Sequence, residues 1–598
     1  MTMEDFRPTP DQKALIEHSG ESLFATAVPG AGKTRTMAQR FIRLTNSSEP
    51  GEDYRGVAAL SFTRVASEEI DKKVNIDGGN GVSPNFIGTI DSFLRRFLVI
   101  PMVKAKLGLV PDFRDEWTEF GELSYFEIPK GVFRNSYLKR ASLAEVDLVN
   151  QKVPSVLLKK GGFYREGLSR EYCRKKVLEK ADERRKELNR RGYFDAFSAR
   201  RVSNYILKKN SYGLIDIIAA RFREIILDEA QDCNSTDLLL LKSLHDRGVR
   251  LTLIGDLNQD IYKFRGSDAQ KVREFCLQRQ FKEITMKANF RSTPEICDLV
   301  SYLRYGDSVV DAPERPGEGN LIKVFGYDDL SKVADLCDEI DAFDNGRATS
   351  TILAATHELV AEASRSKSKK PVTVISKTKR ILVGILLLLD AFGSPSQRMR
   401  GIRLIETGII ENCEFIDGTE ISGRALFEEK ALLHGGTTAL IALHVAFGVK
   451  KCLQDGGRRK AVLNQLIGIL NEWGIRPKKA ARLLPSGQSW DEVLSSADRT
   501  SLNVDAQTIH ASKGAEYDRV VLVLNKRSSH SRYESKAEKL LNLLSENEDD
   551  EARRLFYVGA SRARNELILA VDKQLQSELE RLLMMNSIRF ERINLSHR

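Results

Sequence analysis

The sequence predicts an α/β protein built on parallel sheets, and two stretches carry this prediction. The stretch SLFATAVPGAGKTRTMAQRFIRL (22–44) has the pattern of an apolar strand, a glycine-containing loop and a helix. The stretch ILDEAQD (226–232) begins as an apolar strand and ends in three carboxylates. Ligands of open α/β sheets bind where the strands end. The chain of 598 residues is too long for one core, and its length suggests roughly three to five domains.

The loop that follows the first of these strands has the residue types of a phosphate-binding loop. Glycines let backbone amides close around phosphates, a lysine meets the terminal phosphates, and a threonine hydroxyl can ligate magnesium. Alanine stands at the first position, where the strict pattern has glycine. The residues expected to hold a nucleoside triphosphate are Ala27, Val28, Pro29, Gly30, Ala31, Gly32, Lys33, Thr34 and Arg35.

A phosphate-binding loop in the same chain suggests a function for the carboxylates of ILDEAQD. On these seven residues alone, a strand followed by a polar loop is an equally good interpretation. With a phosphate loop in the same chain, we expect Asp228 and Thr34 to hold magnesium, directly or through water. Glu229 is expected to polarise the attacking water. Nucleoside triphosphate hydrolysis is the reaction that this pair of sites performs.

The overall composition is that of a globular protein without a membrane span. Apolar residues make up 41% of the chain and charged residues 29%. The most hydrophobic run, ILVGILLLL (381–389), is less than half of the about twenty residues that a membrane span needs, so a buried helix is expected there. The seven cysteines are scattered, without a CxxC pair, which is typical of a reducing compartment. We therefore expect a cytoplasmic protein with no membrane partner.

The net charge of +10 is concentrated in one region. Residues 151–210 contain 18 Lys and Arg against 7 Asp and Glu. Within this region, 170–191 has neither proline nor glycine and predicts an exposed helix. A solvated helix is one interpretation. A surface that follows DNA phosphates is the other, since backbone contacts use Lys and Arg without reading bases.

Segments along the whole chain resemble superfamily 1 DNA helicases of the UvrD/Rep/PcrA type, in that family's order. Besides the phosphate loop and ILDEAQD, they are TPDQKALI, ALSFTRVASEEI (59–70), IGTIDSFLRRFL (87–98), LIGDLNQDIYKFRGSD (253–268), ANFRSTPEI, QTIHASKGAEYDRVVLV and RRLFYVGASRARNELILA. The resemblance implies two RecA-like parallel-sheet motor domains, each with a mainly helical insertion. It also implies the cofactors ATP and Mg²⁺.

The resemblance and the composition together predict the domain boundaries. The first motor domain is expected to take residues 1–98 and 193–280, with a basic helical insertion at 99–192. The second is expected to take residues 281–376 and 499–598, with a helical insertion at 377–498. The sequence of this second insertion does not indicate a role.

The resemblance also implies further nucleotide contacts. Gln12 is expected to contact adenine, Glu516 the ribose and Gln259 the γ-phosphate. Phe290 is expected either to stack on adenine or to lie in the core.

Two arginines of the second motor domain have a physical reason to belong to the same site. Hydrolysis builds charge on the transferring phosphoryl group, and an arginine delivered by another domain can stabilise it. Arg291 and Arg562 stand where the family places such residues. We expect them to reach across the cleft, so that closure of the two domains completes the site.

Single-stranded DNA is expected to bind through aromatic stacking beside hydroxyls and basic groups, without sequence readout. Phe264 gives a smaller platform than the tryptophan that is usual in the family. The expected DNA contacts are Phe62, Thr63, Thr89, Tyr262, Phe264, Arg265 and His510.

The leading hypothesis is an ATP-driven motor that moves 3′ to 5′ on single-stranded DNA and unwinds duplex, in DNA repair or anti-phage defence. Its expected partners are single-stranded and tailed duplex DNA. The alternative is a DNA-sensing ATPase subunit that regulates a separate nuclease, as in a Gabija-type anti-phage system. A phosphate-loop ATPase unrelated to nucleic acid is disfavoured by the DNA-facing segments.

Overall fold

The protein is described here from a computed structural model, whose described residues fall into two compact units. The sheet unit comprises Met1–Met102, Val202–Lys369 and Leu502–Arg598, and the insertion unit comprises Val103–Arg201 and Lys370–Ser501. The structure describes residues 6–46, 54–79, 81–114, 117–128, 132, 140–148, 153, 170–261, 267–306, 309–315, 320–344, 349–365, 377–389, 395–421, 424–433, 435–455, 458–487, 490, 493, 505–525, 536–546, 548 and 550–595.

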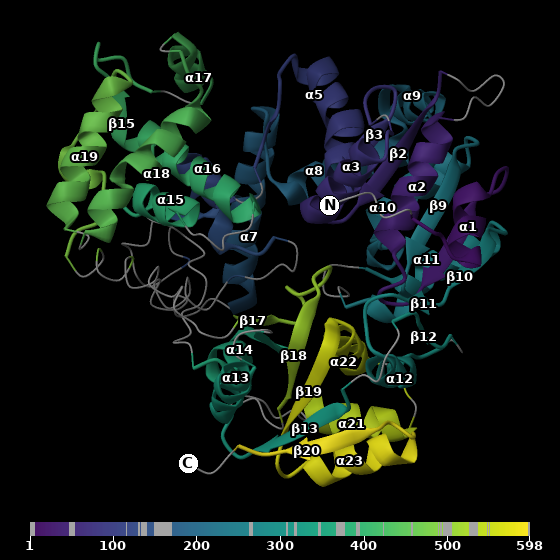
Figure 1. The fold of residues 1–598 in the computed structure, drawn as a ribbon. Helices are drawn as coiled ribbons and strands as arrows, with labels where there is room; N and C mark the ends of the chain where they lie inside the picture. The colour runs from purple at the N-terminus through teal and green to yellow at the C-terminus, as the bar shows by residue number, and fades with distance from the viewer. Residues whose placement is uncertain are drawn as a thin grey trace. The chain divides into compact units, whose positions relative to one another are not determined.

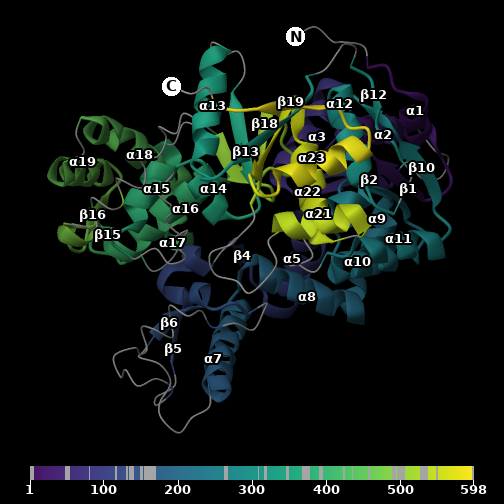
Figure 2. The ribbon, with the colours of Figure 1, turned by 90° about the horizontal axis from the view of Figure 1, so that it is seen from below.

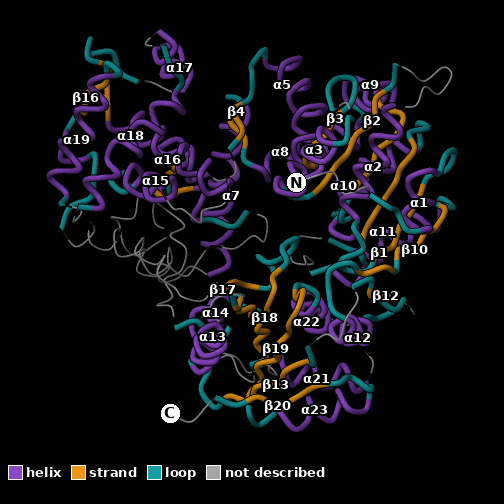
Figure 3. The backbone as a smooth tube through the Cα atoms, in the orientation of Figure 1, coloured by secondary structure: helices purple, strands orange, loops and turns teal. Residues whose placement is uncertain are grey.

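The sheet unit contains a first six-stranded sheet in the order β10-β1-β9-β8-β2-β3, and all its neighbouring strands are parallel. Figure 3 shows its strands in orange among purple helices. Its strands are β1 (Leu23–Ala27), β2 (Gly56–Ser61), β3 (Phe86–Thr89), β8 (Phe222–Leu227), β9 (Arg250–Gly255) and β10 (Lys282–Met286). Its helices are α1 (Pro10–Glu17), α2 (Lys33–Asn46), α3 (Arg64–Ile76), α4 (Ile90–Leu94), α8 (Ala196–Lys209), α9 (Leu214–Arg221), α10 (Ser235–His245) and α11 (Ala269–Gln278).

The strands of this sheet are apolar on both faces because helices cover both. In β1, Phe24 packs into a core with residues of α9 and α10, whereas its neighbours Leu23 and Ala25 pack into a second core with α1, α2 and α3. This alternation is what a strand buried between two helical layers requires.

A second six-stranded parallel sheet has the order β17-β14-β18-β19-β13-β20. The helices α21, α22 and α23 pack against one face and α13 and α14 against the other (Figures 1 and 2). The strands are β13 (Ile322–Tyr327), β14 (Ser350–Ala354), β17 (Asp505–Thr508), β18 (Tyr517–Leu524), β19 (Ala563–Asp572) and β20 (Phe590–Ile593). The helices are α12 (Pro294–Leu303), α13 (Lys332–Phe343), α14 (His357–Ala363), α21 (Lys536–Glu546), α22 (Glu551–Ala560) and α23 (Gln576–Met585).

The two parallel sheets confirm the expected fold class. The short strands β11 (Ala288–Asn289) and β12 (Ala312–Pro313) pair beside them. Strand β10 lies in the first sheet although it follows residue 280, where the first motor domain was expected to end. The predicted domain boundaries stay predictions.

The insertion unit combines both regions predicted as insertions. From the first region come α5 (Ile100–Leu107), β4 (Asp112–Phe113), β5 (Tyr125–Glu127), β6 (Arg140–Ser142) and α7 (Arg170–Arg190). Strand β7 (Tyr193–Phe194), which pairs with β4, also belongs to this unit although it follows the predicted end of the insertion at residue 192. From the second come α15 (Arg380–Leu389), α16 (Pro395–Asn412), β15 (Cys413–Phe415), α17 (Arg424–Leu433), α18 (Thr438–Gln454), α19 (Arg459–Glu472) and β16 (Ile475–Pro477). A buried ion pair between Arg380 and Glu411 lies where they meet, and Glu411 also accepts a hydrogen bond from the Glu122 amide at 3.0 Å.

The hydrophobic run at 381–389 forms α15, as expected. Ile381, Leu382 and Ile385 are fully buried, and the helix packs on α16 and α18. Within the described part of the chain, no single helix is long and apolar enough to cross a membrane. Among the described helices, the pair Leu426–Leu433 and Thr438–Gln454 together has the length and composition of a membrane span, but the two helices are bent by 74° relative to each other.

Candidate functional site

The candidate site lies where three neighbouring strands of the first sheet end. The order β1-β9-β8 brings the phosphate loop after β1 beside the segments that follow β9 and β8. A cavity of about 1080 Å³ opens there. It is lined by the predicted Gln12, Pro29, Gly30, Ala31, Gly32, Lys33, Thr34, Arg35, Glu229, Gln259, Phe290, Arg291, Glu516 and Arg562, and also by Phe6, Arg7, Glu69, Lys73, Gly514, Ala515 and Arg564.

The backbone of the phosphate loop requires its first glycine. Gly30 has a φ of +75°, and a Cβ atom there would lie 2.4 Å from Asn289 Oδ1. A side chain would therefore be strained and would clash. Two predicted loop contacts lie elsewhere: the side chains of Ala27 and Val28 are buried in the core and do not line the cavity. Both side chains pack in the hydrophobic core from which the loop begins.

Gln12 supports the loop from behind. It is 2% exposed, its Nε2 donates to the Ala31 carbonyl at 2.9 Å, and its Oε1 accepts from the Thr9 amide at 2.9 Å. One N–H and one lone pair of the carboxamide stay available to a ligand.

Phe290 is 45% exposed on the cavity, so the core interpretation of this residue is wrong. An exposed aromatic ring at the cavity is a surface on which a base can stack.

The two carboxylates after β8 differ in their electrostatic surroundings. Burial, followed by repulsion from Glu229, raises the pKa of Asp228 to about 7. Burial also opposes ionisation of Glu229, but the positive charges of Lys33 and Lys513 outweigh it and lower the pKa of Glu229 to about 2. Glu229 therefore carries a negative charge at neutral pH. Its φ of +53° is rare for a residue with a side chain and is typical of strained functional positions.

Asp228 and Thr34 offer the ligand type that magnesium prefers. Thr34 Oγ1 lies 3.5 Å from Asp228 Oδ2, and hydroxyl and carboxylate oxygens suit a hard cation that takes its remaining ligands from phosphates and water. Among the residues that the structure describes, no group of three or more His, Cys, Asp or Glu could hold a metal ion.

Arg291, between β11 and α12, and Arg562, directly before β19, both line the cavity. Arg562 is 2% exposed, and its guanidinium donates to Gln259 Oε1 at 2.9 Å and to the Val558 carbonyl at 3.2 Å. Burial, followed by the charge of Arg291, lowers the pKa of Arg562 to about 10, so it stays cationic at neutral pH. Arg291 donates to Glu516 Oε2 at 2.7 Å and to the Ser561 carbonyl at 3.0 Å.

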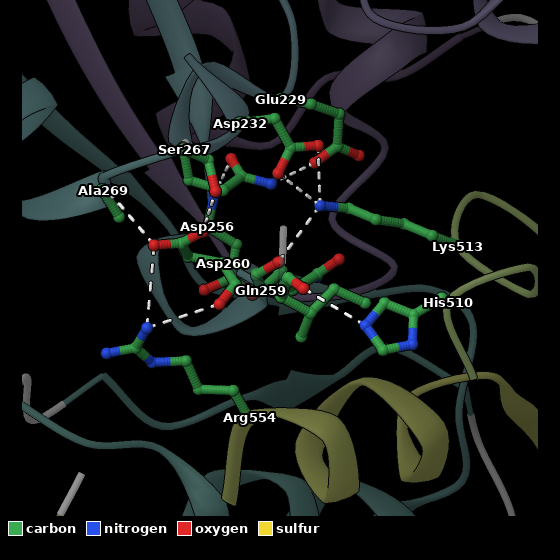
Figure 4. Close-up of polar contacts among 12 residues, drawn as sticks. Glu229, Asp232, Asp256, Gln259, Asp260, Ser267, Ala269, His510, Lys513 and Arg554 are labelled. Carbon is green, nitrogen blue, oxygen red and sulfur yellow. Dashed lines mark hydrogen bonds and ion pairs between the residues drawn. The ribbon is translucent and has the colours of Figure 1, made fainter. Parts of the chain in front are cut away.

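Lys513 belongs to the site although the sequence did not single it out. Its ammonium group donates to both carboxylate oxygens of Asp232, at 2.6 and 2.7 Å, and to the Gln259 carbonyl at 3.1 Å (Figure 4). Burial outweighs the attraction of Lys513 and raises the pKa of Asp232 to about 6. Lys513 is thus a buried cation that joins the acidic segment after β8 to the segment before β18.

The DNA-contact candidates that the structure describes lie outside this cavity. Thr63 and Thr89 cap α3 and α4 at the ends of β2 and β3, where each hydroxyl accepts from a backbone amide and keeps its own proton to donate. Phe62 is half-buried at the end of β2, and His510 Nε2 lies 3.2 Å from the Ile261 carbonyl. Tyr262, Phe264 and Arg265 lie outside the described residues.

The basic helix α7 is only partly exposed, which corrects the prediction of an exposed helix. Cys173, Val177 and Leu188 form an apolar stripe that packs into the core of the first insertion. Arg185 is 2% exposed, pairs with Asp182 and is therefore unable to reach a ligand. The regular spacing of the apolar residues in this helix could have predicted its buried side, but the many charged residues between them favoured the prediction of an exposed helix.

Comparisons with known proteins point to one family. A family model described as the UvrD/REP helicase N-terminal domain matches residues 8–280, and the UvrD-like helicase C-terminal domain matches residues 487–574. The chain is 26% identical to the ATP-dependent DNA helicase PcrA of Bacillus subtilis, over 48% of this chain and 38% of that protein. It is 23% identical to the ATP-dependent DNA helicase UvrD1 of Mycobacterium leprae, over 94% of this chain and 82% of that protein. With the ATP-dependent DNA helicase Rep of Buchnera aphidicola it shares 23% identity, over 54% of this chain and 48% of that protein.

Proposed function

Because the chain belongs to the UvrD-like superfamily 1 helicases, we propose that it is an ATP-dependent DNA helicase that moves 3′ to 5′ on single-stranded DNA and unwinds duplex. One observation carries the proposal. The cavity at the strand ends gathers a phosphate loop, the carboxylate of Glu229, and two arginines that follow the first sheet in the chain, Arg291 and Arg562. The segment of Arg562 belongs to the second sheet, so nucleotide hydrolysis can be coupled to movement of one sheet against the other.

The residues of the cavity divide the work of hydrolysis. The loop amides and Lys33 would hold the phosphates, and Mg²⁺, held by Thr34 and Asp228, would neutralise developing charge when bound. Glu229 would accept a hydrogen bond from the attacking water and orient it, because a group with so low a pKa is a weak proton acceptor. Arg291 and Arg562 would stabilise the charge of the transferring phosphoryl group.

Adenine and ribose contacts are part of the same proposal. Phe290 offers an exposed ring for the base, and Gln12 an N–H and a lone pair. Glu516 lines the cavity beside Arg291 and would accept from a ribose hydroxyl. DNA would contact the hydroxyls and half-buried ring at the ends of β2 and β3. We also infer a cytoplasmic location, which the seven free cysteines support.

The proposal is tested by ATP hydrolysis and strand displacement. We expect ATP turnover to rise on addition of single-stranded DNA, and a duplex with a 3′ tail to be unwound faster than one with a 5′ tail. An ATP turnover rate that is the same with and without single-stranded DNA would contradict the proposal. DNA-stimulated turnover without displacement of either duplex would favour a DNA-sensing ATPase that regulates a separate nuclease, whether in repair or in anti-phage defence.

The exposed part of α7 is the second surface proposed for DNA. Arg174, Lys175 and Arg190 are exposed, and among the described residues none of the three makes an ion pair. Replacing all three by glutamine is expected to weaken DNA binding irrespective of sequence. It should also reduce the log–log slope of affinity against salt by about one unit for each phosphate that the helix no longer binds. Binding measured from low to moderate salt, with ATP turnover in the absence of DNA as a check on folding, decides this.

A matched control has the same change in net charge on the same helix. Lys176, Lys180 and Lys186 already pair with Glu179, Glu183 and Asp182. Their replacement by glutamine should therefore lower affinity less. Equal affinity and salt slope in the wild type and the first variant would exclude a role of this helix in DNA binding.

A further inference from the structure

A buried chain of hydrogen bonds links helix α22 to the candidate site. Tyr557 is fully buried, and its hydroxyl lies 2.6 Å from Asp256 Oδ2. The same carboxylate oxygen accepts from Gln259 Nε2 at 3.0 Å. Gln259 Oε1 in turn accepts from Arg562 Nη2 at 2.9 Å. Gln259 and Arg562 line the cavity, whereas Tyr557 and Asp256 lie behind it.

The direction of each bond in this chain is fixed by its partners. Arg304 Nη1 lies 2.6 Å from the Tyr557 oxygen, and a guanidinium can only donate. The tyrosine proton is therefore directed to Asp256. A carboxylate accepts only, so the amide nitrogen of Gln259 must face Asp256. The carbonyl oxygen of Gln259 is left to face Arg562.

The chain also crosses between the two sheets. Asp256 and Gln259 follow β9 of the first sheet. In Figure 4, Lys513 donates to the Gln259 carbonyl and Arg554 pairs with the neighbouring Asp260. Tyr557 and Arg304 come from α22 and the end of α12, which pack on the second sheet. Asp256 is 1% exposed, so these bonds are shielded from water. Hydrogen bonds are stronger in such a buried environment than in water, and they hold side-chain geometry more firmly there.

We propose that Tyr557 is a positioning residue for ATP hydrolysis, acting through Asp256 to fix the orientation of the Gln259 carboxamide against Arg562. This inference rests on the proposed function. Without the tyrosine hydroxyl, Asp256 Oδ2 loses one of its two donors, so the carboxylate that holds the amide nitrogen of Gln259 is itself held less firmly. A carboxamide turned by 180° would present two N–H donors to a guanidinium, which cannot accept them.

The test is Tyr557→Phe, which removes the hydroxyl and keeps the ring that packs in the core. We expect DNA-stimulated kcat for ATP to fall about ten-fold, the scale of removing a hydrogen bond to a charged group, with KM for ATP changed less than about two-fold. Tyr302→Phe is the matched control. Its hydroxyl donates to the Leu544 carbonyl at 3.4 Å in the same core and has no link to Gln259.

A double-mutant cycle separates positioning from loss of stability. In the background of Gln259→Ala, adding Tyr557→Phe should lower kcat no further, because the residue through which it acts is gone. Equal falls of kcat in both backgrounds, or an unchanged kcat in Tyr557→Phe, would overturn the inference. If Tyr557→Phe unfolds, Asp256→Asn is measured in the same cycle, with the same expected and contrary results. Absence of ATP turnover in the wild type would instead refute the proposed function.

Discussion

Replacing Arg562 by alanine is expected to lower DNA-stimulated ATP turnover by about 10³-fold, the contribution of arginine fingers in related chemistry. The guanidinium is held by Gln259 and by the carbonyls of Val558 and Ala515, so it is already oriented before substrate binds. Its positive charge lies in the same cavity as the negative charge of Glu229, and the two attract each other. Steady-state turnover with saturating DNA measures the effect, and equilibrium binding of a non-hydrolysable ATP analogue should change far less.

Two further variants separate charge from fold. Arg562→Lys keeps the charge but lacks the planar fork that bonds Gln259 and the carbonyls together, so it should restore only part of the rate. Arg592→Ala removes an exposed arginine that pairs with Glu580 in the same domain, and it should leave turnover unchanged. Wild-type turnover in Arg562→Ala would mean that the second sheet does not act on the nucleotide.

The effect of replacing Arg291 is expected to differ from that of replacing Arg562, because it should change KM for ATP as well as kcat. It is more accessible than Arg562 and pairs with Glu516, which is expected to contact the ribose. Arg291→Ala is therefore expected to depress turnover strongly while also releasing Glu516, so KM for ATP should change together with kcat. Thermal unfolding of the variant should stay close to that of the wild type, since Arg291 is at the cavity rather than in a core.

The parts of the site that the sequence could predict are those set by short-range chemistry. Glycine, lysine and threonine between a strand and a helix determine a phosphate loop locally, and Asp228 and Glu229 follow an apolar strand directly. The parallel order β1-β9-β8 then brings their strand ends together. Each of these steps needs only the residues of one segment and a general rule of parallel sheets.

The parts that escaped prediction depend on long-range packing. Lys513 meets Asp232, and Tyr557 meets Asp256, across roughly half the chain, and no spacing along the sequence announces either contact. Arg185 shows the same limit in a helix: its charge suggested exposure, but its place beside the apolar stripe of α7 determined its burial. Types of residue indicate chemistry, whereas the partners of buried polar groups are chosen by the fold.

Replacing Glu229 by glutamine is expected to lower ATP turnover by about 10²-fold or more while ATP still binds. The change removes one negative charge and leaves the size of the side chain and its left-handed backbone almost unaltered. Lys33 and the phosphate loop, which provide binding, are untouched. Lys33→Ala should in contrast lose tight nucleotide binding, because it removes a positive charge that the phosphates would meet.

The control for Glu229→Gln is the same substitution at Glu69, which lines the same cavity but is half-exposed on α3 and pairs with Lys73 at 2.5 Å. A carboxylate in contact with solvent is screened and cannot orient a single water molecule, so Glu69→Gln should keep most of the turnover. Parallel measurements of ATP binding and of DNA-stimulated turnover distinguish the two positions. If Glu229→Gln hydrolysed ATP at nearly the wild-type rate, the carboxylate after β8 would have no part in activating water, and the role assigned to this strand end would have to be abandoned.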